Sequence, residues 1–190
     1  MLPVGWLIGA VVVAVLLTTW VTFTLTRLDR LHARVDAAQA SMDAQLVRRA
    51  AALLHVAESG EPGMPDEARA GLNQVATRAL SVPGSADERQ DAENAVGRAL
   101  RGLAEAPYPL GQDAAEELNE AAARVLIARR FYNDAVRDTR ALRARRLPRL
   151  FRMAGRRALP EFFDIDDTVP PRPFAAPPVP PEAVPPEGRP

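Results

Sequence analysis

The first 26 residues carry no charged side chain, and this stretch constrains the fold more than any other. It contains LPVGWLIGAVVVAVLLTTWVTFTLT. About 20 apolar residues in a helix that rises ~1.5 Å per residue cover the ~30 Å hydrocarbon core of a bilayer. A cleaved signal peptide fits less well, because there is no basic segment before the apolar run and no small-x-small site after it. We therefore predict a transmembrane anchor over residues 1–26.

The residues that flank the anchor predict its orientation. Trp6 and Trp20 lie toward its two ends, where amphipathic rings favour the headgroup region. Arg27, Arg30 and Arg34 follow the apolar run within a few residues, and no arginine precedes it. The positive-inside rule then predicts a single-pass plasma-membrane protein with its N-terminus outside and the rest of the chain in the cytoplasm. The alternative is the reverse orientation, with the bundle outside the cell.

Beyond the anchor, apolar residues recur at intervals of three and four, which is the period of one helix face. In the first helix, predicted to continue from the anchor to about Glu58, they are Leu28, Leu31, Val35, Ala38, Met42, Leu46, Leu53 and Val56. In a long helix predicted over residues 112–146 they are Leu118, Ala121, Val125, Ala128, Tyr132, Ala135, Thr139 and Leu142. Shorter helices are predicted over residues 66–81 and 87–106, separated by Gly- and Pro-containing breaks at 58–65, 83–84 and 107–111.

Four amphipathic helices with short connections and no alternating strand pattern predict an all-α fold. We expect an antiparallel four-helix bundle over residues 27–167. Residues 168–190 are rich in proline and contain one aromatic residue, Phe174, so this tail is predicted to be disordered. Its PPRP and PPVPP segments fit either an inert tail or ligands of polyproline-binding domains.

Two charged residues fall inside the predicted apolar stripes. At ~100° per residue, Arg49 lies in the stripe of the first helix and Glu117 in that of the last. Antiparallel packing would bring these helix ends together, and a buried charge requires a partner. We therefore predict an ion pair between Arg49 and Glu117 with a structural role.

The same projection separates four consecutive residues of the last helix. Phe131 and Tyr132 fall within its ~140° apolar face and are predicted to be core aromatics, with the Tyr132 hydroxyl group forming a hydrogen bond. Asn133 falls at the margin of that face and Asp134 outside it. For these two residues both hydrogen bonding on the helix surface and recognition of a protein partner stay open.

Eight arginines lie close together between residues 140 and 157, with no acidic residue among them. They are Arg140, Arg143, Arg145, Arg146, Arg149, Arg152, Arg156 and Arg157. In an antiparallel bundle the last helix returns to the bilayer, where each arginine near anionic lipid contributes about 1 kcal/mol. The interleaved apolar residues suit either such an interfacial segment or the closed end of the bundle. Nucleic acid is not expected as a partner, because the chain has no net charge and is tethered.

Few residue types suited to catalysis are present. The chain has no cysteine, and all 24 basic residues are arginine, so thiolate and lysine chemistry are excluded. His32 and His55 lie far apart in the sequence and outside any HExxH pattern, so neither a metal nor another cofactor is expected. On the flank of the first helix an aspartate repeats every seven residues, at Asp29, Asp36 and Asp43. The three carboxylates fit a solvated helix face, or a site for a hard cation or a partner. The chain is predicted not to be an enzyme.

Two stretches resemble the LemA family of membrane-anchored bacterial proteins. RVDAAQASMDAQLVRRAAALL at 34–54 is similar to the family run V-D-x-A-x-S-x-I-D-x-Q-L-x-R-R, and ARRFYNDAVRDT at 128–139 is similar to A-R-x-x-Y-N-D-A-V. LAEAPYPL at 103–110 and PEFFDID at 160–166 are weaker similarities. The resemblance implies a membrane helix followed by a helical bundle, with no established catalytic activity.

These observations predict a non-enzymatic scaffold or adaptor of the cell envelope that recruits an unidentified protein partner. The alternative is a module that binds anionic lipid, or organises the membrane, through the arginine block at 140–157.

Overall fold

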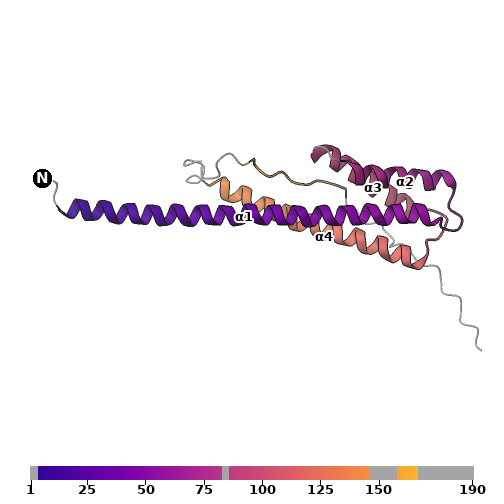
Figure 1. Cartoon of the computed structure of the whole chain (residues 1–190), viewed down its shortest axis with the longest axis horizontal. Helices are drawn as coiled ribbons and strands as arrows, with labels where there is room; N and C mark the ends of the chain where they lie inside the picture. Colours follow the sequence, from indigo (N-terminus) through magenta and orange to yellow (C-terminus); the bar gives the residue numbers. More distant parts are fainter. Residues whose placement is uncertain (1–3, 83–85, 146–157, 167–190) are drawn as a thin grey trace, which may run out of the picture. The chain divides into compact units, whose positions relative to one another are not determined.

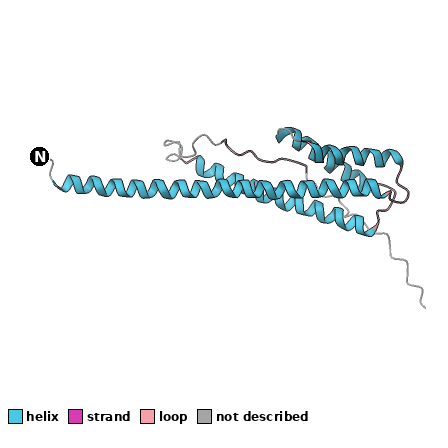
Figure 2. Cartoon of the chain, viewed as in Figure 1, coloured by secondary structure: helices cyan, strands magenta, loops and turns pink. Residues whose placement is uncertain are grey.

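The computed structural model describes residues 4–82, 86–145 and 158–166. These residues form four α-helices and no strand (Figure 1, Figure 2), which confirms the predicted all-α class. The helices are α1 (Val4–Ser59), α2 (Asp66–Ser81), α3 (Ala86–Ala104) and α4 (Gln112–Arg143). The predicted proline-rich tail at 168–190 lies outside the described residues.

Helix α1 has 56 residues and is long and apolar enough near the N-terminus to cross a membrane. Its most apolar 18-residue window has a mean hydropathy of 2.3, and none of that window is buried. The hydroxyl groups of Thr18 and Thr19 donate to the carbonyls of Ala14 and Val15 at 2.8 and 2.9 Å. Each of these two hydroxyl groups thus donates its hydrogen bond within the helix, as an apolar environment requires.

The predicted break after α1 is present and depends on backbone conformation. Gly60 and Gly63 have φ values of 68° and 82°, a region that favours glycine because it has no Cβ. Between them the chain turns, and the Met64 N–H donates to the Glu61 carbonyl at 3.1 Å. Pro65 then precedes the first turn of α2, where its missing N–H costs no helical hydrogen bond.

The chain divides into two compact units, and α1 and α4 contribute to both. We call the described residues of 1–44 and 127–163 the anchor unit, and the described residues of 45–126 and 164–190 the core unit. In the core unit, apolar side chains of all four helices form one buried cluster, because each helix has an amphipathic face. Its most buried members are Leu53, Ala76, Val96 and Leu118.

The periodicity of α4 predicted its buried face correctly. All eight stripe positions are buried, and the relative exposure of each is 8% or less, namely Leu118, Ala121, Val125, Ala128, Tyr132, Ala135, Thr139 and Leu142. The hydroxyl of Thr139 donates to the Ala135 carbonyl at 2.9 Å, so this polar residue is satisfied inside the buried face.

The predicted partner of Arg49 is wrong. Arg49 is buried as expected, but its Nη2 lies 2.7 Å from Oε2 of Glu93 in α3, and Glu117 is exposed. The side chains of Arg49 and Glu93 are 4% and 2% exposed. Helical projection gives the direction of a side chain from its own axis, but not which of several helices faces it. The prediction compared the two long helices and left α3 out.

Candidate functional site

Residues 158–163 of the anchor unit form neither helix nor strand and are held by side chains of α4. We call this segment, ALPEFF, the strap. Three of its carbonyls each accept one hydrogen bond: Ala158 from Arg143 Nη1 at 2.8 Å, Pro160 from Arg140 Nη1 at 3.0 Å, and Glu161 from the Tyr132 hydroxyl at 2.8 Å. The strap is therefore bound mainly through its backbone.

Asn133 fixes the end of the strap with two hydrogen bonds. Its Nδ2 donates to the Phe163 carbonyl at 3.0 Å, and its Oδ1 accepts from the Phe163 N–H at 2.9 Å. One amide side chain thus satisfies both polar groups of one backbone residue, as a neighbouring strand would in a sheet. Phe163 itself is buried, with 7% relative exposure.

Arg140 also contacts the aromatic part of the strap. Its guanidinium carbon lies 5.3 Å from the centroid of the Phe162 ring, which is within the range of a cation–π interaction. The same guanidinium donates to the Pro160 carbonyl. Arg140 therefore contacts both the backbone and one ring of the strap.

In the core unit, the next three residues bind to α3 in the same manner. The N–H groups of Asp164 and Asp166 donate to the side-chain oxygens of Gln90 and Asn94 at 3.3 and 2.8 Å. The Asp166 carboxylate lies 3.0 Å from Arg101 Nη2. A Cβ added to Gly97 would meet the Asp166 carbonyl oxygen at 3.0 Å, so the absence of a side chain permits this approach.

A cavity of about 360 Å³ lies in the anchor unit beside the strap. Its polar lining comes from α1 (His32, Asp36 and Gln39), from Tyr132 of α4, and from Glu161 of the strap. Burial, with the negative charges of Asp43 and Glu161, raises the pKa of the Tyr132 hydroxyl above its ordinary value of 10.0. Tyr132 therefore stays protonated at neutral pH and acts as a hydrogen-bond donor.

The structure separates the four residues of the Phe-Tyr-Asn-Asp sequence. Tyr132 is buried and hydrogen-bonded, which confirms the prediction for it. The prediction that Phe131 is a core aromatic is wrong, because its relative exposure is 62%. Adjacent helical residues point ~100° apart, and the buried stripe that contains Tyr132 is narrower than the ~140° face used for the prediction.

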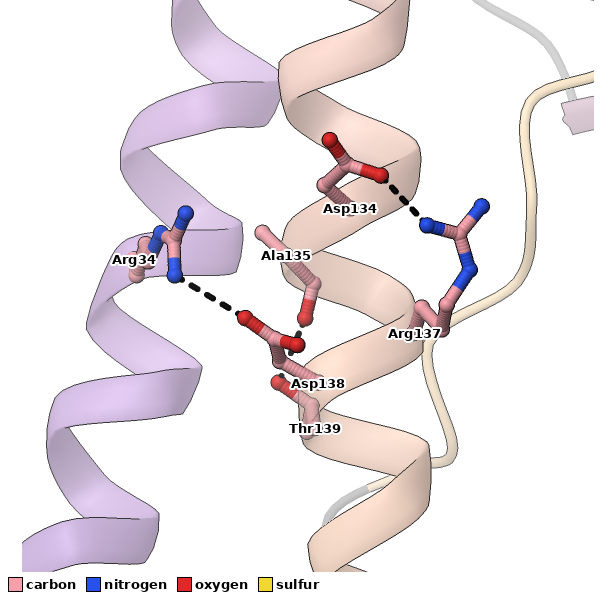
Figure 3. Close-up of polar contacts among 6 residues, drawn as sticks. All are labelled: Arg34, Asp134, Ala135, Arg137, Asp138 and Thr139. Atoms are coloured by element: carbon pink, nitrogen blue, oxygen red, sulfur yellow. Dashed lines mark hydrogen bonds and ion pairs between the residues drawn. The ribbon is translucent and has the colours of Figure 1, made fainter.

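The other two residues of the quartet form intramolecular contacts. Asn133 binds the strap, whereas Asp134 forms an ion pair with Arg137 on its own helix at 2.6 Å (Figure 3). Hydrogen bonding thus accounts for both, and recognition of a protein partner by either stays a prediction. Figure 3 also shows the exposed ion pair that joins α1 to α4, in which Arg34 Nη1 lies 3.0 Å from Asp138 Oδ2.

The arginine block is described only in part. Arg140 and Arg143 bind the strap, and Arg145 is exposed. The remaining predicted lipid-surface residues, Arg146, Arg149, Arg152, Arg156 and Arg157, lie outside the described residues.

The three regularly spaced aspartates of α1 have different environments. Asp29 is exposed, Asp36 lines the cavity, and Asp43 is half-buried. Within the described parts of the chain, no group of three or more His, Asp or Glu side chains is placed to hold a metal ion.

Sequence reasoning missed the strap as a structural element. Besides the weak family similarity of PEFFDID at 160–166, its only signal was the alternation at the end of the strap and just after it, where Phe163 and Ile165 are buried and Asp164 between them is exposed. This alternation is typical of an extended segment with one buried side, but two residues are too few to predict it.

Comparison of the chain with protein-family models, curated proteins and solved structures finds no match.

Proposed function

We propose that this chain is a LemA-like, single-pass scaffold of the cell envelope that has no catalytic activity and recruits a protein partner. The observation that carries the proposal is the use of the ARRFYNDAVRDT motif, in which Tyr132 and Asn133 hold the backbone of the strap. The most distinctive polar residues of the motif thus support an intramolecular binding surface.

The proposal includes an antiparallel helical bundle on the cytoplasmic side of the plasma membrane. Within the anchor unit, Arg34 of α1 lies against Asp138 of α4, while the charge of Asp43 acts on Tyr132. Rising residue numbers in α1 therefore correspond to falling numbers in α4, which supports opposite helix directions. The apolar window of α1 supports the anchor, and the arginines that follow it support the orientation.

Binding of anionic lipid is the less favoured role. Arg140 and Arg143 donate hydrogen bonds to strap carbonyls, and a guanidinium used in this way has fewer donors left for lipid phosphates. Two of the eight block arginines therefore have an intramolecular task, which favours the scaffold.

Proximity labelling in living cells tests the scaffold role. The full chain carries the labelling enzyme at its C-terminus, and the control fusion carries only the anchor, residues 1–33. A scaffold predicts a small set of proteins that are labelled by the full chain and not by the anchor. Identical labelling by both fusions would contradict the proposal.

Hydrogen exchange in lipid nanodiscs separates the two roles. A lipid-binding module predicts slow exchange at residues 140–157 in discs of anionic lipid, lost at high salt and in discs of neutral lipid. The scaffold predicts the same exchange in both lipids.

A further inference from the structure

The contacts between α4 and the strap have the properties of a peptide-binding site that is occupied by its own chain. Four α4 side chains make five hydrogen bonds to backbone atoms within six consecutive strap residues. All five bonds engage main-chain groups, so their geometry depends on an extended conformation and not on the identity of most strap side chains. Recognition of an extended main chain with side-chain pockets for specificity is a recurring mode of peptide binding.

We propose that the α4 surface formed by Tyr132, Asn133, Arg140 and Arg143 is a peptide-recognition site, and that a partner's extended Pro-acid-aromatic-aromatic segment replaces the strap there. The inference rests on the proposed scaffold function for the existence of a partner. It adds the site and the chemical class of the segment that is recognised.

The strap itself defines the chemistry that fits. The site contacts Pro160 through its carbonyl, so a residue without an N–H is accepted at this position. The next position contributes its carbonyl to Tyr132, and the exposed side chain of Glu161 lines the cavity beside Tyr132. The following two positions take aromatic rings, one beside the Arg140 guanidinium and one buried as Phe163 is.

The surrounding charge adds a second requirement. The site contributes the guanidinium groups of Arg140 and Arg143, and these favour an acidic over a basic peptide. The strap carries one acid, Glu161, between its proline and its two phenylalanines. An extended segment with proline, an acid and two aromatics in this order is therefore the chemical class expected of the partner.

Displacement is a competition between a tethered and a free ligand. A tethered segment acts at an effective concentration in the millimolar range, so it weakens binding of a free peptide to the intact chain. A partner on the same membrane is itself concentrated, which offsets part of this disadvantage. The strap thus sets a threshold for binding and does not block the site permanently.

The test uses the full chain in detergent micelles with the strap residues 158–163 replaced by glycine and serine. The probe is a fluorescent synthetic peptide with the sequence ALPEFFDID, and its anisotropy reports binding. We expect saturable binding to this strap-blank chain, at least about 10-fold tighter than to the wild-type chain, because the tethered competitor is gone.

Two further variants assign the binding to the site. In the strap-blank chain, Asn133→Ala is expected to weaken the peptide by about 10-fold or more, because two hydrogen bonds are lost. Asp134→Ala is the matched control, since the neighbouring carboxylate pairs with Arg137 on its own helix, and binding should not change. Equal effects of the two variants would overturn the assignment to this surface.

Hydrogen exchange in the wild-type chain keeps the proposal testable if the strap-blank chain does not fold. Excess peptide is expected to speed exchange of the Phe163 amide, because Asn133 then binds the free peptide. Unchanged exchange at saturating peptide, or a folded strap-blank chain that does not bind, overturns the inference. Either result leaves the scaffold role intact if proximity labelling still detects partners of the full chain. If the peptide binds but proximity labelling detects no partner, only the scaffold role is contradicted.

Discussion

Removal of the Glu93 carboxylate tests the packing of the core unit most directly. Arg49 Nη2 lies 2.7 Å from Glu93 Oε2 and 3.3 Å from the Glu93 carbonyl oxygen, and both side chains are almost fully buried. In Glu93→Ala the guanidinium keeps only the backbone acceptor. Arginine does not lose its proton in proteins, so its charge stays in the interior without a counter-charge.

The expected loss of stability is large for a single substitution. Breaking a buried ion pair by removing one partner costs about 3–5 kcal/mol. At roughly 2–4 °C per kcal/mol for a chain of this size, the melting temperature should fall by about 6–20 °C. The double variant Arg49→Met with Glu93→Leu removes both charges and keeps side-chain volume. It should lie within about 1 kcal/mol of wild type or be more stable.

Thermal unfolding of the full chain in detergent, followed by far-ultraviolet circular dichroism, measures these changes. Glu117→Ala is the control, because Glu117 is exposed on α4 and its replacement should change stability by no more than about 0.5 kcal/mol. The reasoning is refuted if Glu117→Ala melts as low as Glu93→Ala. It is also refuted if the double variant is no more stable than Glu93→Ala, because the cost would then not come from the unpaired guanidinium.

Three further predictions concern single contacts. Because the pKa of Tyr132 is raised in the folded chain, its contribution to stability is complete below pH 10.0 and is lost as the pH rises through the folded pKa. In a spectrophotometric titration, the difference in tyrosinate absorbance between wild type and Tyr132→Phe should therefore develop above pH 10.0. Gly97→Ala should melt below Gly102→Ala in the same helix, because a Cβ at 97 meets a backbone oxygen at 3.0 Å and one at 102 meets nothing within 4 Å. Arg34→Ala should cost less than about 1 kcal/mol in thermal unfolding, with the difference reduced at high salt, because both side chains of its pair with Asp138 are 54% exposed.

The fold could be predicted wherever the signal is local. A helix that buries one face must place apolar residues at a period of 3.6, so the stripe of α4 is readable without knowledge of what covers it. The breaks are equally local, since Gly60 and Gly63 adopt conformations that favour glycine. The direction of each side chain from its own helix axis therefore followed from the sequence.

The residue that a buried side chain contacts could not be predicted in this way. Arg49 was placed inside correctly, but its pairing with Glu93 depends on the position of α3, which no period in α1 encodes. The width of a buried face is set in the same way by the neighbouring elements. Phe131 lies beyond the edge of that face although it is adjacent to buried Tyr132.

The contacts between α4 and the strap could not be predicted from the sequence, for a related reason. The hydrogen bonds to the strap join residues 15 to 30 positions apart and end on backbone atoms, so these bonds by themselves require no particular side chain in the strap. The side chains that make these bonds do carry a pattern, because only particular residue types can reach and satisfy a main chain. The site therefore restricts the residue types of α4, at Tyr132 and Asn133, much more than those of the segment that it binds. The polar residues Tyr132 and Asn133 of the α4 motif are thus explained by hydrogen bonds to a main chain. We infer that the side chains that bind the strap can bind another extended chain in the same way.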